Sequence, residues 1–244
     1  MNKFNIIPNI KYFSILEFVE DYLVHKRNFI LGYLNTYTFD IYNKTKLINS
    51  SYPYFFIPDG VGMYLYLKCI NFQKLSFKNR LVSTNIWDSI LSIANKKSLN
   101  CMIIGGQISF TDKLRDVFNS KYPNIDLLEV INGYTQYDID KFPKKIDVLI
   151  LGLGTPKQEE WILKNYDNFN ISILLMVGSA LDYWSGAIKR APQWIQNIGL
   201  EWLYRLFQEP KRLWRRYIFG IPVFMFHIVV QKVKLVLKKI SPEC

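Results

Sequence analysis

The feature that most restricts the fold of this 244-residue chain is a repeated alternation of short apolar runs with longer segments of helical periodicity. Such alternation is typical of a parallel sheet, whose strands are buried on both faces and joined by helices. We expect strands at residues 29–34, 53–57, 101–106, 125–131, 146–151 and 171–177. We expect helices at residues 14–25, 61–70, 83–95, 109–120 and 156–166. The sequence therefore predicts an α/β fold with an open, mostly parallel, Rossmann-like sheet and helices on both of its faces.

The last quarter of the chain differs in composition. Residues 187–244 contain 11 Lys and Arg against three Asp and Glu, so most of the formal net charge of +11 lies there. Residues 217–230 are almost entirely apolar, but a helix of that length spans about 21 Å, less than the roughly 30 Å of a hydrocarbon core. A helix at 229–240 would carry one apolar stripe, as interfacial helices do. We predict a Rossmann-like domain over 1–188 and a basic, aromatic, helical, membrane-associating appendage over 189–244.

Other features narrow the class of protein. Three widely spaced cysteines and two histidines favour neither a disulfide framework nor a histidine-rich metal site. The first residues lack the apolar core and cleavage site of a secretory signal, so we expect a cytoplasmic protein. A basic, aromatic tail is compatible with an anionic membrane or with nucleic acid. The apolar stretch at 217–230 favours the membrane, because nucleic-acid binding does not require it.

Ligands of doubly wound folds bind outside the carboxyl ends of the strands, so the loops there are the first candidates for a site. Two of them, 105–109 and 152–159, contain glycines whose neighbouring N–H groups could hold a diphosphate. Neither loop matches GxGxxG or GxxxxGK[ST]. Ordinary turns remain an equal alternative, with Thr155 as N-cap and Pro156 at the first helical position. Ser109 and Asp112 have the spacing of a capping box.

Charged residues near the strand ends have alternative interpretations. Asp59 follows a strand, where a carboxylate can take a proton from an attacking hydroxyl, yet a Pro-Asp-Gly turn also explains the tripeptide. Arg80 either neutralises phosphate or lies on the surface. The sequence Asp138-Ile139-Asp140 has the DxD form of some metal-dependent glycosyltransferases, but a three-residue pattern is common by chance.

Two long strings resemble a known family. LGLGTPKQEEW at 151–161 is similar to the LGxPxQExW element of the WecG/TagA/CpsF glycosyltransferases. VGSALDYWSGAIKRAPQWIQNIGLEWLYRLFQEPKRLWRRY at 177–217 resembles their GxxxDxxxGxxxRAPxWxxxxGLEWLxRLxxEPxRLxxRY signature. The chain departs from the family's Thr-x-Asn element, where it reads Tyr33-Leu34-Asn35, and from the Gly and Asp that usually follow the residue matched by Arg80.

The resemblance implies an activity. It implies an inverting, metal-independent transferase that needs no cofactor and moves an N-acetylmannosamine-type or related hexose from a UDP-sugar donor to a polyprenyl-diphosphate-linked glycan acceptor. The process would be bacterial surface-polysaccharide or teichoic-acid assembly. The protein would act peripherally, at the anionic surface of the inner membrane on its cytoplasmic face. Nucleic acid is not an expected partner, and a homo-oligomer is possible. The alternative is a non-catalytic, membrane-docked module that binds a nucleotide sugar.

The resemblance also implies roles for individual residues. Asp59 would be the general base, and three further residues would be catalytic, namely Asn35, Arg80 and Gln158. The implied nucleotide-binding residues are Gly105, Gly106, Gly154, Pro156, Gln158 and Asp182. The implied contacts to the acceptor diphosphate and membrane are Arg205, Arg212 and Arg215. No metal ligand is implied.

Overall fold

The chain forms two compact units, each described by itself. The computed structural model describes residues 12–24, 28–45, 47–48, 51–69, 82–106, 108–134 and 138–240. The sheet unit comprises Met1–Tyr33, Thr45–Ile57 and Val82–Lys189, and the helical unit comprises Leu34–Lys44, Pro58–Leu81 and Arg190–Cys244. The division at 188 and 189 stays a prediction, and the helical unit adds two earlier segments to the tail.

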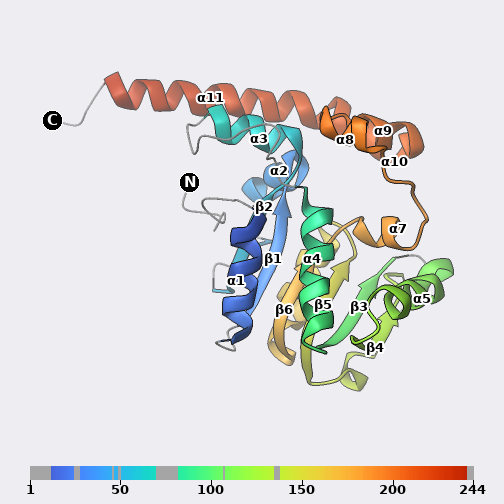
Figure 1. The fold of residues 1–244 in the computed structure, drawn as a ribbon. Coiled ribbons are helices and arrows are strands. Elements are labelled where there is room, and N and C mark those ends of the chain that lie inside the picture. The colour runs from blue at the N-terminus through green and yellow to red at the C-terminus, as the bar shows by residue number, and fades with distance from the viewer. Residues whose placement is uncertain are drawn as a thin grey trace. The chain divides into compact units, whose positions relative to one another are not determined.

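The sheet confirms the predicted fold class. Its six strands are β1 (Phe29–Leu34), β2 (Tyr54–Pro58), β3 (Asn100–Gly105), β4 (Asp126–Ile131), β5 (Lys145–Gly152) and β6 (Asn170–Met176). They lie in the order β2-β1-β6-β5-β3-β4 (Figure 1). The pairs β1–β6, β6–β5, β5–β3 and β3–β4 are parallel. Their central residues are buried apolar side chains, such as Ile103, Ile150 and Leu174, as expected of strands covered on both faces.

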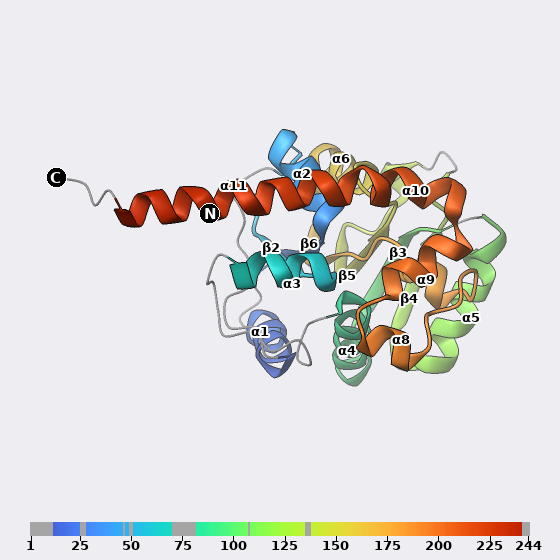
Figure 2. The same cartoon turned by 90° about the horizontal axis from the view of Figure 1, so that it is seen from above.

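Four helices of the sheet unit lie close to their expected positions, namely α1 (Tyr12–Val24), α4 (Ser83–Lys96), α5 (Thr111–Lys121) and α6 (Lys157–Asn165). A further short helix, α7 (Ala180–Trp184), was not predicted. Figure 2 shows α1 and α4 on one side of the sheet and α6 on the other.

The predicted caps are wrong. Ser109 lies in a 3-10 turn, η2 (Ile108–Phe110). The N-cap residue of α5 is Phe110, which makes no side-chain capping hydrogen bond. The N-cap of α6 is Pro156 rather than Thr155. The Thr155 hydroxyl donates to a carboxylate inside the helix instead, because Glu159 lies one turn further on.

Every element of the helical unit in the described ranges is a helix. These are α2 (Thr36–Lys44), α3 (Gly60–Cys69), α8 (Gln193–Asn197), α9 (Glu201–Gln208), α10 (Pro210–Ile218) and α11 (Gly220–Ile240). In α11, Phe224 is buried and its ring lies 5.7 Å from that of Phe39 in α2 and 5.9 Å from that of Tyr66 in α3. The helix therefore lies against α2 and α3 (Figures 1 and 2).

The helix α11 starts earlier than its predicted position at 229–240. Gly220 and Pro222 both fall in its first turn, where a missing N–H costs no helical hydrogen bond. Within the described residues, the stretch Pro210–Val230 is long and apolar enough to cross a membrane by length and composition alone. Only 17% of its 18-residue apolar window is buried, so most residues of that window are at least partly exposed in the part of the chain that the structure describes.

Candidate active site

The carboxyl ends of β3 and β5 carry two glycines that face each other. Gly105 and Gly152 are register partners, and a Cβ atom on Gly105 would lie 2.6 Å from the carbonyl carbon of Gly152. The chain leaves β3 outward to β4 and leaves β5 the opposite way to β6, so these two strands form a topological switch point. Such points are where open α/β sheets bind their ligands. The structure thus brings the loops at 105–106 and 152–159 to the expected place.

The conformation of both loops depends on glycine. Gly106 has φ +74° and Gly154 has φ +75°, in the left-handed region that side chains disfavour. A Cβ atom on Gly154 would meet none of the described residues within 4 Å, so they leave this stretch of backbone open on that side. The carbonyl of Gly106 accepts a hydrogen bond of 3.0 Å from the Gly133 N–H. This bond links the β3 loop to the Asn132-Gly133-Tyr134 segment after β4.

Gln158 lies beneath the β5 loop rather than on its surface. It is 0% exposed, and its amide donates to Glu159 at 3.2 Å and to Thr155 at 3.4 Å. Thr155 donates to the same Glu159 oxygen at 2.8 Å. Within the described residues, the Gln158 side-chain oxygen has no hydrogen-bond partner. The buried Glu159 carboxylate therefore stabilises the loop by accepting hydrogen bonds from Thr155 and Gln158. A role of Gln158 in substrate binding stays a prediction.

Asp182 lies in the first turn of α7, directly after β6. It is half-buried, and its backbone carbonyl accepts from Ile188 N–H at 3.1 Å and from the Ser185 hydroxyl at 3.2 Å. The predicted nucleotide-binding residues thus follow three neighbouring strands, β3, β5 and β6.

In the helical unit, Asn35 and Asp59 occupy the starts of α2 and α3. The Asn35 side-chain oxygen accepts from the N–H groups of Tyr37 and Thr38, each at 3.0 Å, so Asn35 caps α2. Asp59 is half-buried, and its N–H donates to the Leu34 carbonyl at 2.8 Å. Capping of α2 is a structural reason for an asparagine at position 35 that requires no substrate. The catalytic role of Asn35 stays a prediction.

A second carboxylate interacts with Asp59. Glu201, at the start of α9, forms an ion pair with Arg190 across 3.5 Å. Burial raises the pKa of Glu201, Arg190 opposes this, and the Asp59 carboxylate raises the pKa further. Asp59 therefore lies within electrostatic range of an acidic side chain that the sequence analysis did not identify.

The predicted acceptor-binding arginines differ in their partners. Arg205 of α9 and Arg212 of α10 both bind Glu209, with Nε to oxygen distances of 3.2 Å and 2.7 Å. Burial raises the pKa of Glu209, but the two guanidinium groups outweigh it, so the pKa lies below its ordinary value. Arg215 is exposed, with its guanidinium 5.2 Å from the centre of the Trp214 ring. The structure thus brings Arg205 and Arg212 together and leaves Arg215 outside the pair.

The remaining candidates are less informative. Arg80 lies outside the described residues. Asp138 of the DxD pattern accepts from the Asp140 N–H at 3.1 Å, so it caps a 3-10 turn, η3 (Ile139–Lys141). Over the described ranges no group of three or more His, Cys, Asp or Glu side chains is placed to hold a metal ion. Metal independence stays a prediction.

Two acidic residues, Glu201 and Glu209, were missed because the motif suggested only its arginines as functional groups. The signal for Glu209 was present in the spacing, since Arg205 lies four residues before it and Arg212 three residues after it. No comparable spacing links Glu201 to Asp59, because their proximity comes from tertiary structure.

The parallel sheet, with glycine turns at the carboxyl ends of β3 and β5, defines a Rossmann-like α/β protein. The chain belongs to the glycosyl transferase WecG/TagA/CpsF family, whose model matches residues 7–237. This confirms the resemblance seen in the sequence and makes the protein a glycosyltransferase.

Similar proteins include the N-acetylglucosaminyldiphosphoundecaprenol N-acetyl-beta-D-mannosaminyltransferases of Staphylococcus aureus strains MW2, NCTC 8325 / PS 47 and COL. Each is 28% identical over 186 residues, which cover 74% of this chain and 71% of the relative.

Proposed function

We propose that this protein transfers an N-acetylmannosamine-type or related hexose from a UDP-sugar to a polyprenyl-diphosphate-linked sugar, with inversion and without a metal ion. The names of the similar transferases support the sugar and the lipid-linked acceptor. The observation that carries the donor half is the pair of glycine turns at the switch point, where Gly106 and Gly154 have positive φ and a Cβ atom on Gly154 would meet none of the described residues within 4 Å.

The proposed chemistry is a single displacement. Asp59 takes the proton of the acceptor hydroxyl while that oxygen bonds to the anomeric carbon of the donor. The bond from this carbon to the UDP oxygen breaks, and UDP leaves with the electron pair. One displacement inverts the configuration.

Arginines of the helical unit suit the diphosphate of the acceptor. Guanidinium groups make bidentate, charge-assisted hydrogen bonds to phosphate oxygens. Arg205 and Arg212 are already held close together by Glu209, which lowers the entropic cost of gathering them around an anion. Arg215 and its Trp214 neighbour suit the headgroup layer of the cytoplasmic membrane face.

The test is transfer from a panel of UDP-sugars to a short-chain prenyl-diphosphate glycan, followed by mass measurement of the products and assay of released UDP. Asp59→Asn is expected to lower turnover about a hundredfold or more, with affinity for UDP little changed, because only the base is lost. If this variant retains most of the wild-type activity, Asp59 is not the general base.

A matched variant tests the metal. Asp140→Asn makes the same change in the DxD pattern and is expected to leave turnover unchanged, in the presence or absence of a chelator. Loss of activity in this variant, together with loss of activity in the wild type when a chelator is added, would indicate a metal-bound donor instead. Binding of UDP without any release of UDP in the presence of acceptor would favour the non-catalytic module.

A further inference from the structure

The short helix α7 carries Asp182, yet it cannot fix its own orientation. It has five residues, and an isolated helix of that length is unstable. Its direction therefore depends on the contacts at its two ends. Asp182 lies between those ends and takes whatever orientation they impose.

The first anchor of α7 is Leu181. A Cβ atom on Gly152 would lie 2.2 Å from Leu181 Cδ1, so the leucine side chain packs directly on the backbone at the end of β5. This contact fixes the position of the helix start, but it is apolar and has no preferred direction.

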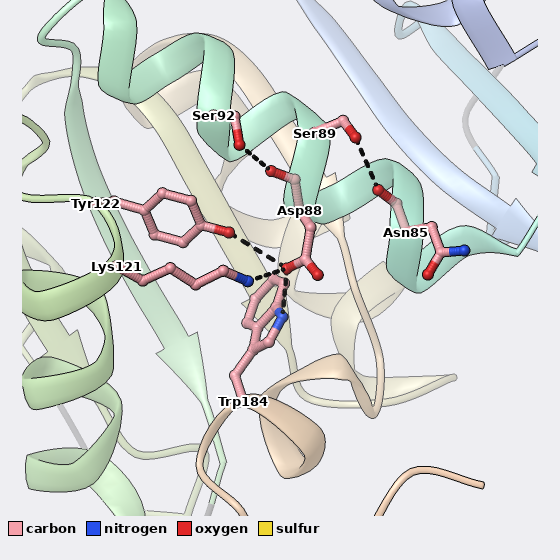
Figure 3. A network of polar contacts seen from close by, with 7 residues as sticks. All are labelled: Asn85, Asp88, Ser89, Ser92, Lys121, Tyr122 and Trp184. Carbon is pink, nitrogen blue, oxygen red and sulfur yellow. Dashed lines mark hydrogen bonds and ion pairs between the residues drawn. The ribbon is translucent and has the colours of Figure 1, made fainter. Parts of the chain in front are cut away.

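The second anchor is Trp184, at the end of α7. Its ring packs edge-on against Phe118 of α5, with centres 5.7 Å apart. Its indole N–H donates to the Asp88 carboxylate of α4 across 2.9 Å (Figure 3). A hydrogen bond to a carboxylate is directional, so it fixes the rotation of α7 about the Leu181 contact.

Asp88 is itself held by two further donors. The same carboxylate oxygen accepts from Lys121 Nζ at 3.1 Å and from the Tyr122 hydroxyl at 3.3 Å (Figure 3). Burial, and then the Asp88 charge, raises the pKa of Tyr122, which keeps the phenol protonated as a donor. One carboxylate thus joins α4, the end of α5 and α7.

We infer that Asp88 is a positioning residue which, through the Trp184 indole, orients Asp182 toward the nucleoside of the donor. The inference rests on the proposed function, because it takes Asp182 as the nucleotide contact that the family resemblance implies. A carboxylate accepts hydrogen bonds and repels phosphate, so Asp182 suits the hydroxyl and N–H groups of a nucleoside rather than its diphosphate. Phosphate binding belongs to the glycine loops.

The experiment measures binding of UDP, UMP and inorganic pyrophosphate to the full chain by calorimetry. Asp88→Ala and Trp184→Phe are each expected to weaken UDP and UMP binding about tenfold, the typical effect of one hydrogen bond to a charged group. Binding of pyrophosphate should stay unchanged. The double variant should bind UDP no more weakly than either single variant, because both remove the same hydrogen bond.

Three controls separate positioning from general stability. Asp88→Asn keeps an acceptor oxygen for the indole and should bind UDP like the wild type. Lys121→Met and Tyr122→Phe remove the other donors to Asp88 without touching α7, so they should lower the melting temperature but not UDP affinity.

The outcomes distinguish the two proposals. If the wild-type protein binds no UDP, the proposed function fails. If the wild type binds UDP and Trp184→Phe binds it equally well, the role of Asp88 fails. Equal weakening of UDP and pyrophosphate binding, or an equal loss in Lys121→Met, would also overturn it. Trp184→Phe keeps the ring against Phe118, so the test remains decisive if Asp88→Ala does not fold.

Discussion

Single residues at the strand ends set how closely neighbouring backbones approach. Gly105 has φ +144°, and its α-carbon faces the Gly152 backbone so closely that no side-chain atom fits. Only glycine satisfies both conditions, because it lacks a Cβ atom and tolerates positive φ. The close pairing of β3 and β5 at the switch point therefore depends on one residue type.

Gly105→Ala should lower the free energy of unfolding by about 3 kcal/mol, since an unfavourable φ adds to a backbone clash. The matched control is Gly186→Ala, because Gly186 has φ +71° but a Cβ atom there would meet none of the described residues within 4 Å. It should lose about 1 kcal/mol from backbone strain alone. Urea denaturation measures both values, and equal losses would show that the contact with Gly152 relaxes at no cost.

Between elements, Glu209 joins the end of α9 to the start of α10. Its carboxylate binds Arg205 on one side and Arg212 on the other, and its pKa lies below the ordinary value of 4.5. A lowered pKa in the folded state stabilises the protein above pH 4.5, where the carboxylate is ionised in both states. This stabilisation is lost as the pH falls through the folded value.

Glu209→Gln should therefore be less stable than the wild type by about 1 kcal/mol at pH 7, a value limited by the exposure of Arg212. The difference should narrow as the pH falls below 4.5. Thermal unfolding across this range measures it. When Arg212→Gln is already present, the Glu209→Gln substitution should change the pH dependence of stability by less. If the stability difference between the wild type and Glu209→Gln stays constant with pH, the assigned ion pairs are contradicted.

The elements differ in how well the sequence predicts them. The strands β3, β5 and β6 are continuous apolar runs, so their burial on both faces could be read directly. The helix α2 was missed, because TYTFDIYNK is rich in aromatic and β-branched residues with weak helical propensity. Its helix depends on the Asn35 cap and on packing of Phe39 against Phe224, a residue almost two hundred positions away.

The same distinction applies to the candidate site. The glycine loops were predictable, because strand ends and turn residues are local signals. Roles that depend on partners from distant segments were not. Two examples are the ion pair of Arg190 with Glu201 and the hydrogen bond from Trp184 to Asp88. No helix or strand periodicity in the sequence links the partners, so these contacts could not be predicted from it.

For the whole molecule, the tail packs within the helical unit, and the proposal also gives it a membrane surface to bind; truncation would remove both. Removing the residues after 191 would delete Phe224 and uncover Phe39 and Tyr66, in addition to removing the exposed apolar surface. Loss of activity in such a truncation would not separate membrane binding from folding of the helical unit. Substitutions of exposed side chains avoid this problem.

The exposed apolar side chains of α10, of α11 and of Phe219 between them give the substitutions that test membrane binding. Phe219 and Phe226 are 61% and 66% exposed. Inserting both into a bilayer contributes about 3 kcal/mol or more, and each basic residue adds about 1 kcal/mol at an anionic surface. The double variant Phe219→Ser with Phe226→Ser should therefore lose most of its binding to phosphatidylglycerol vesicles, including the part that persists at high salt. Lys211→Glu should weaken binding mainly at low salt, because charge is screened.

Vesicle sedimentation measures these effects, with Leu163→Ser as the control. Leu163 is an exposed apolar residue of α6, in the sheet unit, and its loss should leave binding unchanged. Wild-type binding to phosphatidylglycerol that is no tighter than binding to neutral vesicles would contradict the electrostatic part. Equal losses in Leu163→Ser would contradict the assignment of the surface to α10 and α11. If the wild type instead binds oligonucleotides in a salt-dependent manner and ignores vesicles, the basic tail has a nucleic-acid partner and the membrane proposal is wrong.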